Sequence, residues 1–196
     1  MTDAFAKPAV IDTDVIRNLG PLAPLAGVWE GAKGVDVAPT RGGDAISHYR
    51  ERITFEPWGP VNNHAQTLYG LRYTTTIWRV SEEGAYHDEV GYWLWDPQAQ
   101  MVMRCFAIPR GINILAGGYA AANARDFKLS AQVGSEVFGI LSNPFLDKVF
   151  KTMRYDLEVR IHSGSNFSYA EDSQLRIHGQ APIYHHTDRN SLKRVD

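Results

Sequence analysis

The sequence predicts an all-β protein, a closed antiparallel up-and-down β-barrel of about ten strands with a short N-terminal helix. Segments rich in β-branched and aromatic residues recur about every 8–12 residues and are separated by turn signals. No repeat, linker or low-complexity tract divides the 196 residues, which can bury one sizeable core. We therefore expect an N-terminal extension over residues 1–21 and a single barrel domain over residues 22–196.

The elements are expected to follow one another with little helix between them. A short helix is expected within residues 9–19, because Gly20-Pro21 would end it. A strand is expected over Tyr49–Phe55, in which apolar and polar side chains alternate, so that one face is predicted to be buried. One further helical turn is expected near Pro144–Phe150. The other strands are expected over residues 66–80, 87–95, 100–108, 112–119, 127–133, 136–141, 155–162, 167–177 and 183–195.

The charge of the chain argues against several kinds of partner. The 20 Lys+Arg and 22 Asp+Glu residues give a formal net charge of −2, without a long run of like charge. This balance is evidence against a nucleic-acid partner and against a polybasic membrane arm. Arg50, Arg52 and Arg72 could form a basic stripe, but Glu51 and Glu56 interleave with them, which favours cross-strand ion pairs.

The start of the chain and its single cysteine predict the cellular location. The first residues lack the basic and apolar regions of a signal peptide, and no uncharged apolar stretch approaches about 18 residues. Cys105 lies within a predicted strand and is expected to be buried and inert, so no internal disulfide supports the fold. We expect a cytoplasmic protein.

Motifs of familiar enzyme classes are absent from the sequence. It contains no Gly-x-x-x-x-Gly-Lys-Ser/Thr, His-Glu-x-x-His, Cys-x-x-Cys or Gly-x-Ser-x-Gly pattern. No hydrolase, kinase or dehydrogenase chemistry is predicted, and the residues by themselves leave the question of catalysis open.

The most distinctive local motif is Gly27-x-Trp29-x-Gly31-x-x-Gly34. A Gly-x-Trp on the first strand recurs in calycin barrels, where the indole plugs one end, and glycines let a strand bend as its sheet curls. We expect Trp29 to be such a core plug rather than a ligand contact. The motif resembles the Gly-x-Trp-x-Gly-x-Gly signature of the nitrobindin-like haem-binding β-barrels, with one additional residue before the last glycine. Those barrels are relatives of the lipocalin-type and fatty-acid-binding-protein barrels.

Further anchors extend the same resemblance over most of the chain. Pro39-Thr40 follows the first strand as in that family, and the segment Trp78–Tyr92 resembles its Trp…His-x-Glu-x-Gly-Tyr/Phe hairpin. The last strand, with its His185-His186 pair, resembles the family strand that carries the iron-ligating histidine.

The resemblance implies that haem b is held by a histidine of the last strand. Alternation places His186 on the same face as Tyr184, Asp188 and Asn190, and places His185 on the wetter face. His186 is therefore the first candidate for the axial iron ligand and His185 the second. The alternative is a polar strand cap without metal, which the polar neighbours of His186 make equally acceptable.

Family position implies three more contacts with haem. Thr40 and Lys148 are candidate polar contacts to the haem edge. His87 is a candidate on the opposite side of the haem, although hydrogen bonds that anchor its hairpin are the favoured explanation for this residue.

Two main functions follow from these observations. The resemblance implies ferric haem whose open side binds nitric oxide or isomerises peroxynitrite to nitrate. The alternative is a non-haem carrier of a fatty acid or another small hydrophobic ligand, in which Arg72, Arg104 or Arg154 would receive a carboxylate. A third hypothesis is a catalytically silent barrel used for protein contact or as a homodimer. Aromatic residues that alternate inward are expected to form the cavity wall: Tyr69, Tyr73, Trp93, Trp95, Phe167 and Tyr169.

Overall fold

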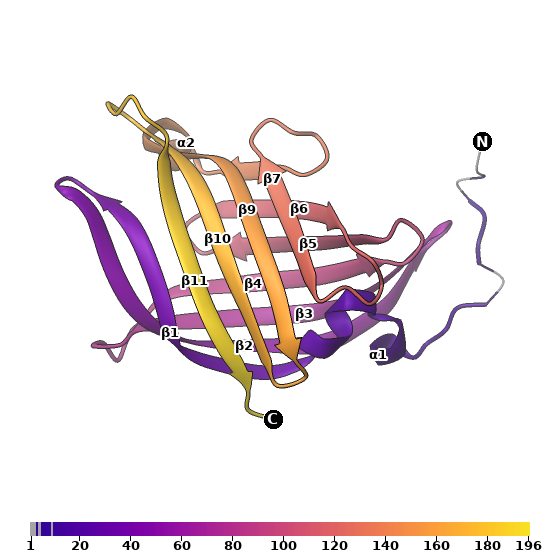
Figure 1. Cartoon of the computed structure of the whole chain (residues 1–196). Helices are drawn as coiled ribbons and strands as arrows, with labels where there is room; N and C mark the ends of the chain where they lie inside the picture. The colour runs from indigo at the N-terminus through magenta and orange to yellow at the C-terminus, as the bar shows by residue number, and fades with distance from the viewer. Residues whose placement is uncertain (1–2, 4, 9) are drawn as a thin grey trace.

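The computed structural model describes residues 3, 5–8 and 10–196, and in this part of the chain eleven strands dominate (Figure 1). The helical elements are α1 (Val15–Asn18), the 3-10 helix η1 (Gly20–Leu25) and α2 (Pro144–Val149). The strands are β1 (Gly27–Thr40), β2 (Gly43–Asn63), β3 (Gln66–Arg79), β4 (Ala85–Asp96), β5 (Met101–Ile108), β6 (Ile112–Tyr119), β7 (Asp126–Gln132), β8 (Ile140–Ser142), β9 (Phe150–Ser163), β10 (Asn166–Ile177) and β11 (Tyr184–Arg194).

The strands form one antiparallel sheet that closes on itself. Their order is β5-β4-β3-β2-β1-β11-β10-β9-β7-β6-β8, and β5 also pairs with β6. Ten strands therefore make the barrel, and β8 is an additional short strand beside β6. The predicted fold class, a closed up-and-down barrel of about ten strands, is confirmed. The pairing between β6 and β7 is the shortest in the barrel, because it consists of the single residue pair Gly117 and Ser130.

Several sequence-based boundaries differ from the observed ones. The N-terminal helix is only Val15–Asn18, because the side chain of Asp14 caps it by accepting from the backbone N–H of Arg17. Residue 9, where that helix was expected to begin, lies outside the described residues. The strand expected over residues 136–141 shrinks to β8, since Ser135 instead closes a turn with Phe138. The helical turn near Pro144 is confirmed as α2.

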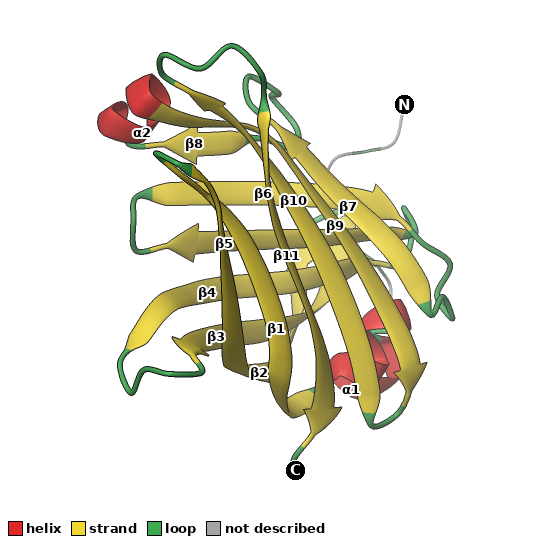
Figure 2. Ribbon diagram, turned by 60° about the vertical axis from the view of Figure 1, so that its left-hand side comes forward, coloured by secondary structure: helices red, strands yellow, loops and turns green. Residues whose placement is uncertain are grey.

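One end of the barrel is closed by η1 and by Trp29. The ring of Trp29 is fully buried, and its Nε1–H donates to the backbone oxygen of Leu25 at 2.7 Å. The ring also contacts Phe167 edge-on at 4.8 Å between centroids, and the Arg194 guanidinium lies 4.6 Å from its centre. Trp29 is thus a structural plug. The helices α1 and α2 lie at opposite ends of the barrel (Figure 2), so the end beside α2 is the open one.

The outer surface carries some of the expected ion pairs. Arg52 pairs with Glu30 of the neighbouring strand, and Arg72 pairs with Glu56. The expectation was wrong for Glu51, which points into the barrel because it shares the inward face of β2 with Tyr49 and Ile53. No helix in the described part of the chain has the length and apolarity needed to cross a membrane.

Candidate functional site

The barrel encloses a cavity of about 380 Å³ that opens beside α2. This volume lies within the range of roughly 300–1,000 Å³ that small-molecule sites occupy. Apolar side chains form one part of its wall and polar side chains the other. The apolar lining includes Ile53, Phe55, Trp93, Phe106, Ile108, Ile112, Ile114, Leu146, Phe150, Leu157, Val159, Phe167 and Leu175. The polar lining includes Asp36, Glu51, Tyr73, His87, Glu89, Arg104, Tyr155, Tyr169, Glu171, His186 and Asp188.

His186 is a wall residue of the cavity. Its Nε2 lies 2.7 Å from Oδ1 of Asp36, a buried carboxyl on the neighbouring strand β1. No hydrogen bond to Nδ1 of His186 is present among the described residues. A carboxylate that accepts from one imidazole nitrogen orients the ring and makes the other nitrogen a better ligand. His186 is therefore a candidate ligand at the cavity wall, with Asp36 as the carboxyl that orients it.

His185 points the other way. It lies on the outer face of β11, where its Nδ1 is 2.7 Å from Oδ2 of Asp172. It does not line the cavity. As an alternative ligand for a group inside the barrel it is ruled out by strand alternation, because consecutive side chains of β11 face opposite sides.

Deeper in the barrel, two carboxyl groups share a hydrogen-bond network with two tyrosines. Tyr49 donates to Asp188, and its hydroxyl is 2.8 Å from that of Tyr169. Tyr169 and the Asn190 amide donate to Oε2 of Glu51 at 2.9 and 2.8 Å. Burial raises the pKa of Glu51 to about 7, and burial together with the nearby Glu171 raises the pKa of Asp188 to about 9. At neutral pH Asp188 therefore keeps its proton, and Glu51 keeps its proton in about half of the molecules.

Arg104 occupies the centre of a second network. Its guanidinium pairs with both Glu89 and Glu171, and it also donates to the hydroxyls of Tyr73 and Tyr155. Burial opposes the charge of Arg104, but these neighbours outweigh it and raise the pKa of Arg104 well above its usual value. Burial alone would raise the pKa of Glu89. The Arg104 charge and the His87 hydrogen bond outweigh this effect and hold the pKa below its usual value. The buried guanidinium is thus neutralised by the protein itself.

His87 belongs to the same network. Its Nε2 lies 3.1 Å from Oε1 of Glu89, two residues along β4, so this bond connects the β3–β4 hairpin to the network inside the barrel. Burial works to lower the pKa of His87, but the Glu89 carboxylate more than offsets it and the pKa is raised. Because Glu89 also pairs with Arg104, His87 is held at the cavity wall by a fixed carboxylate.

The remaining candidate residues lie at the mouth. Thr40 ends β1, where its hydroxyl donates to the backbone oxygen of Gly43 at 2.8 Å and closes the turn to β2. Lys148 lies exposed in the last turn of α2, and neither residue lines the cavity. Arg110, in the turn between β5 and β6, does line it, and within the described residues no carboxylate pairs with its guanidinium. Among the described lysines and arginines near the mouth, Arg110 is therefore the one that lines the cavity.

Sequence reasoning missed Asp36, Glu51 and the Arg104 network. The available signal was a charged residue on the apolar face of a strand. Arg104 shares the inward face of β5 with the buried Val102 and Phe106, and Glu51 shares the inward face of β2 with its apolar neighbours. Such residues point inward and must find partners there, because an unpaired buried charge is too costly.

The fold and this cavity define a closed antiparallel barrel whose interior has the size of a small-molecule site and opens at one end. No group of three or more His, Cys, Asp or Glu side chains that could hold a metal ion is present in the described part of the chain. Residues 18–194 match the family model described as "THAP4-like, heme-binding beta-barrel domain". The chain belongs to this family, and the resemblance to nitrobindin-like barrels is confirmed.

A solved structure has the same fold. The crystal structure of Rv2717c from M. tuberculosis superposes with a TM-score of 0.65 at 24% sequence identity, covering 94% of this chain and 99% of the other. At this identity the likeness concerns the fold alone. A search of curated proteins found no match.

The cavity can be tested for its fit to haem from its own residues. Haem requires an apolar slot, an axial ligand and room for two carboxylates at the edge of the slot. Apolar side chains would supply the slot, His186 next to Asp36 an imidazole nitrogen, and Arg110 a cation at the mouth. The donor set therefore fits the group that the family name implies.

Proposed function

We propose that this barrel holds haem b through His186. The observation that carries the proposal is the pairing of His186 with Asp36 at the wall of an otherwise largely apolar cavity. Asp36 would keep the imidazole oriented and electron-rich. Arg110 would face the propionate groups at the mouth, where solvent also reaches them.

The bound iron would supply the redox and ligand-binding chemistry, with nitric oxide or peroxynitrite as the small reactant and nitrate as the product of isomerisation. The protein's part is to exclude water with Phe106, Trp93 and their apolar neighbours, and to leave one side of the group accessible. His87, fixed by Glu89, would offer a hydrogen bond from a separate part of the wall.

A fatty-acid carrier is less well supported. A carrier that buries the ligand carboxylate inside the barrel needs a free cation at that depth. Arg72 and Arg154 lie outside the barrel in ion pairs with Glu56 and Asp156, and Arg104 already has two carboxylate partners. A fatty acid that entered to that depth would have to displace Glu89 or Glu171.

The test compares two neighbouring histidines. Protein reconstituted with ferric haem is expected to show a Soret band at one haem per chain, and His186→Ala is expected to weaken haem binding at least tenfold. His185→Ala is the matched control, because its side chain faces outward, and should bind haem as the wild type does. Equal haem affinity in wild type and His186→Ala would refute the proposed ligand. Conversion of peroxynitrite by the loaded wild type, followed by the nitrate to nitrite ratio, tests the catalytic step.

A further inference from the structure

The barrel wall is irregular where β1 passes β11. The register of these two strands shifts between Glu30 and Val35, so the residues between them lack regular partners on β11. On the β11 side of this irregularity, the backbone N–H of Ser191 donates to the side-chain oxygen of its neighbour Asn190 at 2.8 Å. A bulge of this kind bends a strand and interrupts the ladder. The outer surface of the wall is therefore uneven at this point.

A groove of about 410 Å³ lies over the irregular stretch, on the outside of the barrel. Its volume is within the range of roughly 300–1,000 Å³ that small-molecule sites occupy. Small side chains form its floor, namely Ser168 and Ala170 of β10 and Ser191 of β11. Ser168 and Ser191 are register partners, so the floor continues from one strand to the next. We call this depression the outer groove.

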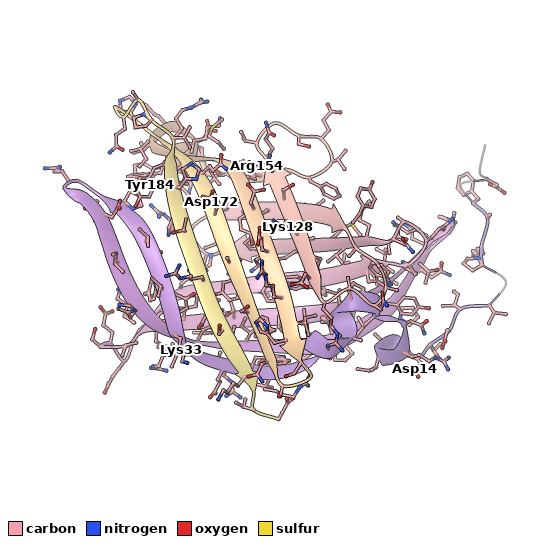
Figure 3. All side chains as sticks on the ribbon, viewed as in Figure 1. Asp14, Lys33, Lys128, Arg154, Asp172 and Tyr184 are labelled. Carbon is pink, nitrogen blue, oxygen red and sulfur yellow. The ribbon has the colours of Figure 1, made fainter. Side chains whose placement is uncertain are left out.

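Three cations from three strands surround the outer groove. They are Lys33 of β1, Arg160 of β9 and Arg189 of β11, and all three are exposed. Lys33 is labelled on this wall in Figure 3. Within the described residues, Lys33 and Arg189 form no ion pair, and Arg160 reaches Asp126 only through Nε at 3.6 Å. The rim of the groove therefore carries positive charge that the protein does not neutralise.

The carboxylate in the lining of the outer groove already has a partner. Glu158 of β9 lies opposite Lys128 of β7 and forms an ion pair with it. The hydrogen bond from Lys128 lowers the pKa of Glu158, so this pair is fully charged and internally balanced at neutral pH. The groove is thus locally positive on a chain whose formal net charge is −2.

Hydrogen bonds from inside the barrel fix the floor of the groove. The buried amide of Asn190 donates to Oε2 of Glu51 at 2.8 Å and accepts from the backbone of Ser191. The hydroxyl of Ser168 lies 2.8 Å from Nε2 of His162. When that nitrogen carries the hydrogen, the hydroxyl accepts from it and keeps its own hydrogen for a ligand. A floor held in this way is organised before a ligand arrives.

We propose that the outer groove binds a single phosphate group, either free phosphate or the phosphate ester of a small polar molecule. Arg160 and Arg189 would supply planar guanidinium groups that match phosphate oxygens, and Lys33 would supply a compact positive charge. The hydroxyls of Ser168 and Ser191 would donate from the floor. The site lies on the outer wall and does not depend on the proposed haem site inside the barrel.

A long polyanion such as a nucleic acid fits this wall less well. Beside the outer groove the wall carries Asp156 and Asp172, which pair with Arg154 and His185 (Figure 3). A nucleic-acid strand that continued along the wall would therefore meet carboxylates as well as cations, and like charges repel. Uncompensated positive charge confined to the groove suits one phosphate group.

The test is a titration of the ¹⁵N-labelled full chain, followed by the backbone amide resonances. Inorganic phosphate and glycerol 3-phosphate are the two probes, added separately at constant ionic strength and at about pH 7.5, where the phosphate group is largely dianionic. Saturable shifts are expected at Lys33, Ser168 and Ser191. Lys33→Gln and Arg189→Gln are each expected to weaken binding about threefold or more. Ser191→Asp places a negative charge in the floor and is expected to abolish saturation.

Arg176→Gln is the matched control, because Arg176 is an exposed cation at the other end of β10 and its loss changes the net charge equally. It should bind both probes as the wild type does, and the spectra themselves show whether each variant folds. Tighter binding of glycerol 3-phosphate than of phosphate supports the proposal and assigns the groove to an ester, whereas the reverse order supports free phosphate. No saturable shift with either probe, or equal weakening in Arg176→Gln, would overturn the proposal. A single-stranded DNA oligonucleotide that binds more tightly than both probes, and is released in Lys33→Gln, would assign the groove to nucleic acid and also overturn it.

Discussion

Carboxyl groups inside this barrel differ in protonation because their partners differ. Glu89 has Arg104 and His87 beside it and stays ionised. Glu51 has only neutral donors, which are Thr75, Tyr169 and Asn190, so burial dominates and its pKa rises to about 7. A carboxyl group that faces into the barrel is therefore ionised or protonated depending on whether a cation lies within reach.

This difference predicts how Glu51 affects stability as the pH changes. The folded state keeps the Glu51 proton up to about pH 7, whereas the unfolded chain loses it near 4.5, so the folded state binds more protons between these values. The free energy of unfolding of wild type should therefore fall relative to Glu51→Gln as the pH rises from 4.5 to 7, by up to about 3 kcal/mol. The amide can replace the neutral acid in the network. Urea denaturation of both proteins across this range measures the difference, and parallel curves would contradict the assignment.

At the scale of the element, β1 is shaped by its glycines. The register of β1 against β2 shifts between Gly31 and Gly34, and Tyr49 of β2 fills the space that the shift creates. A side chain at Gly34 would overlap the Tyr49 ring, which is fully buried and hydrogen-bonded to Tyr169 and Asp188. The lack of a side chain at Gly34 thus leaves room for the Tyr49 ring and its hydrogen bonds.

Substitution of Gly34 should therefore be costly. Gly34→Ala is expected to lower the free energy of unfolding by about 1–3 kcal/mol, because the buried ring cannot move aside. Gly42→Ala is the control, since no atom lies within 4 Å of the added carbon, and its effect should stay within about 0.5 kcal/mol. Equal urea midpoints for the two variants would show that Tyr49 can adjust.

For the whole molecule, closure of the barrel joins the two ends of the domain. β1 pairs with β11, so Trp29 meets Arg194 across nearly the full length of the chain. Loop closure on this scale costs entropy before the contacts compensate for it. Refolding in stopped-flow fluorescence, for which the five tryptophans serve as probes, is expected to take milliseconds to seconds. Complete refolding within microseconds would contradict this.

Alternation and turn signals in the sequence determined the fold class, the α2 turn and the inward direction of Phe55 and Trp93, because these depend on local periodicity. The family also followed from local motifs, such as that around Trp29. Only the tertiary structure decided the partners of the polar residues. Asp36 and His186 are 150 positions apart, and they meet because β1 closes against β11. The two carboxylates that neutralise Arg104 likewise come from other strands. Burial and charge depend on which strands become neighbours, and periodicity within one strand carries no information about that.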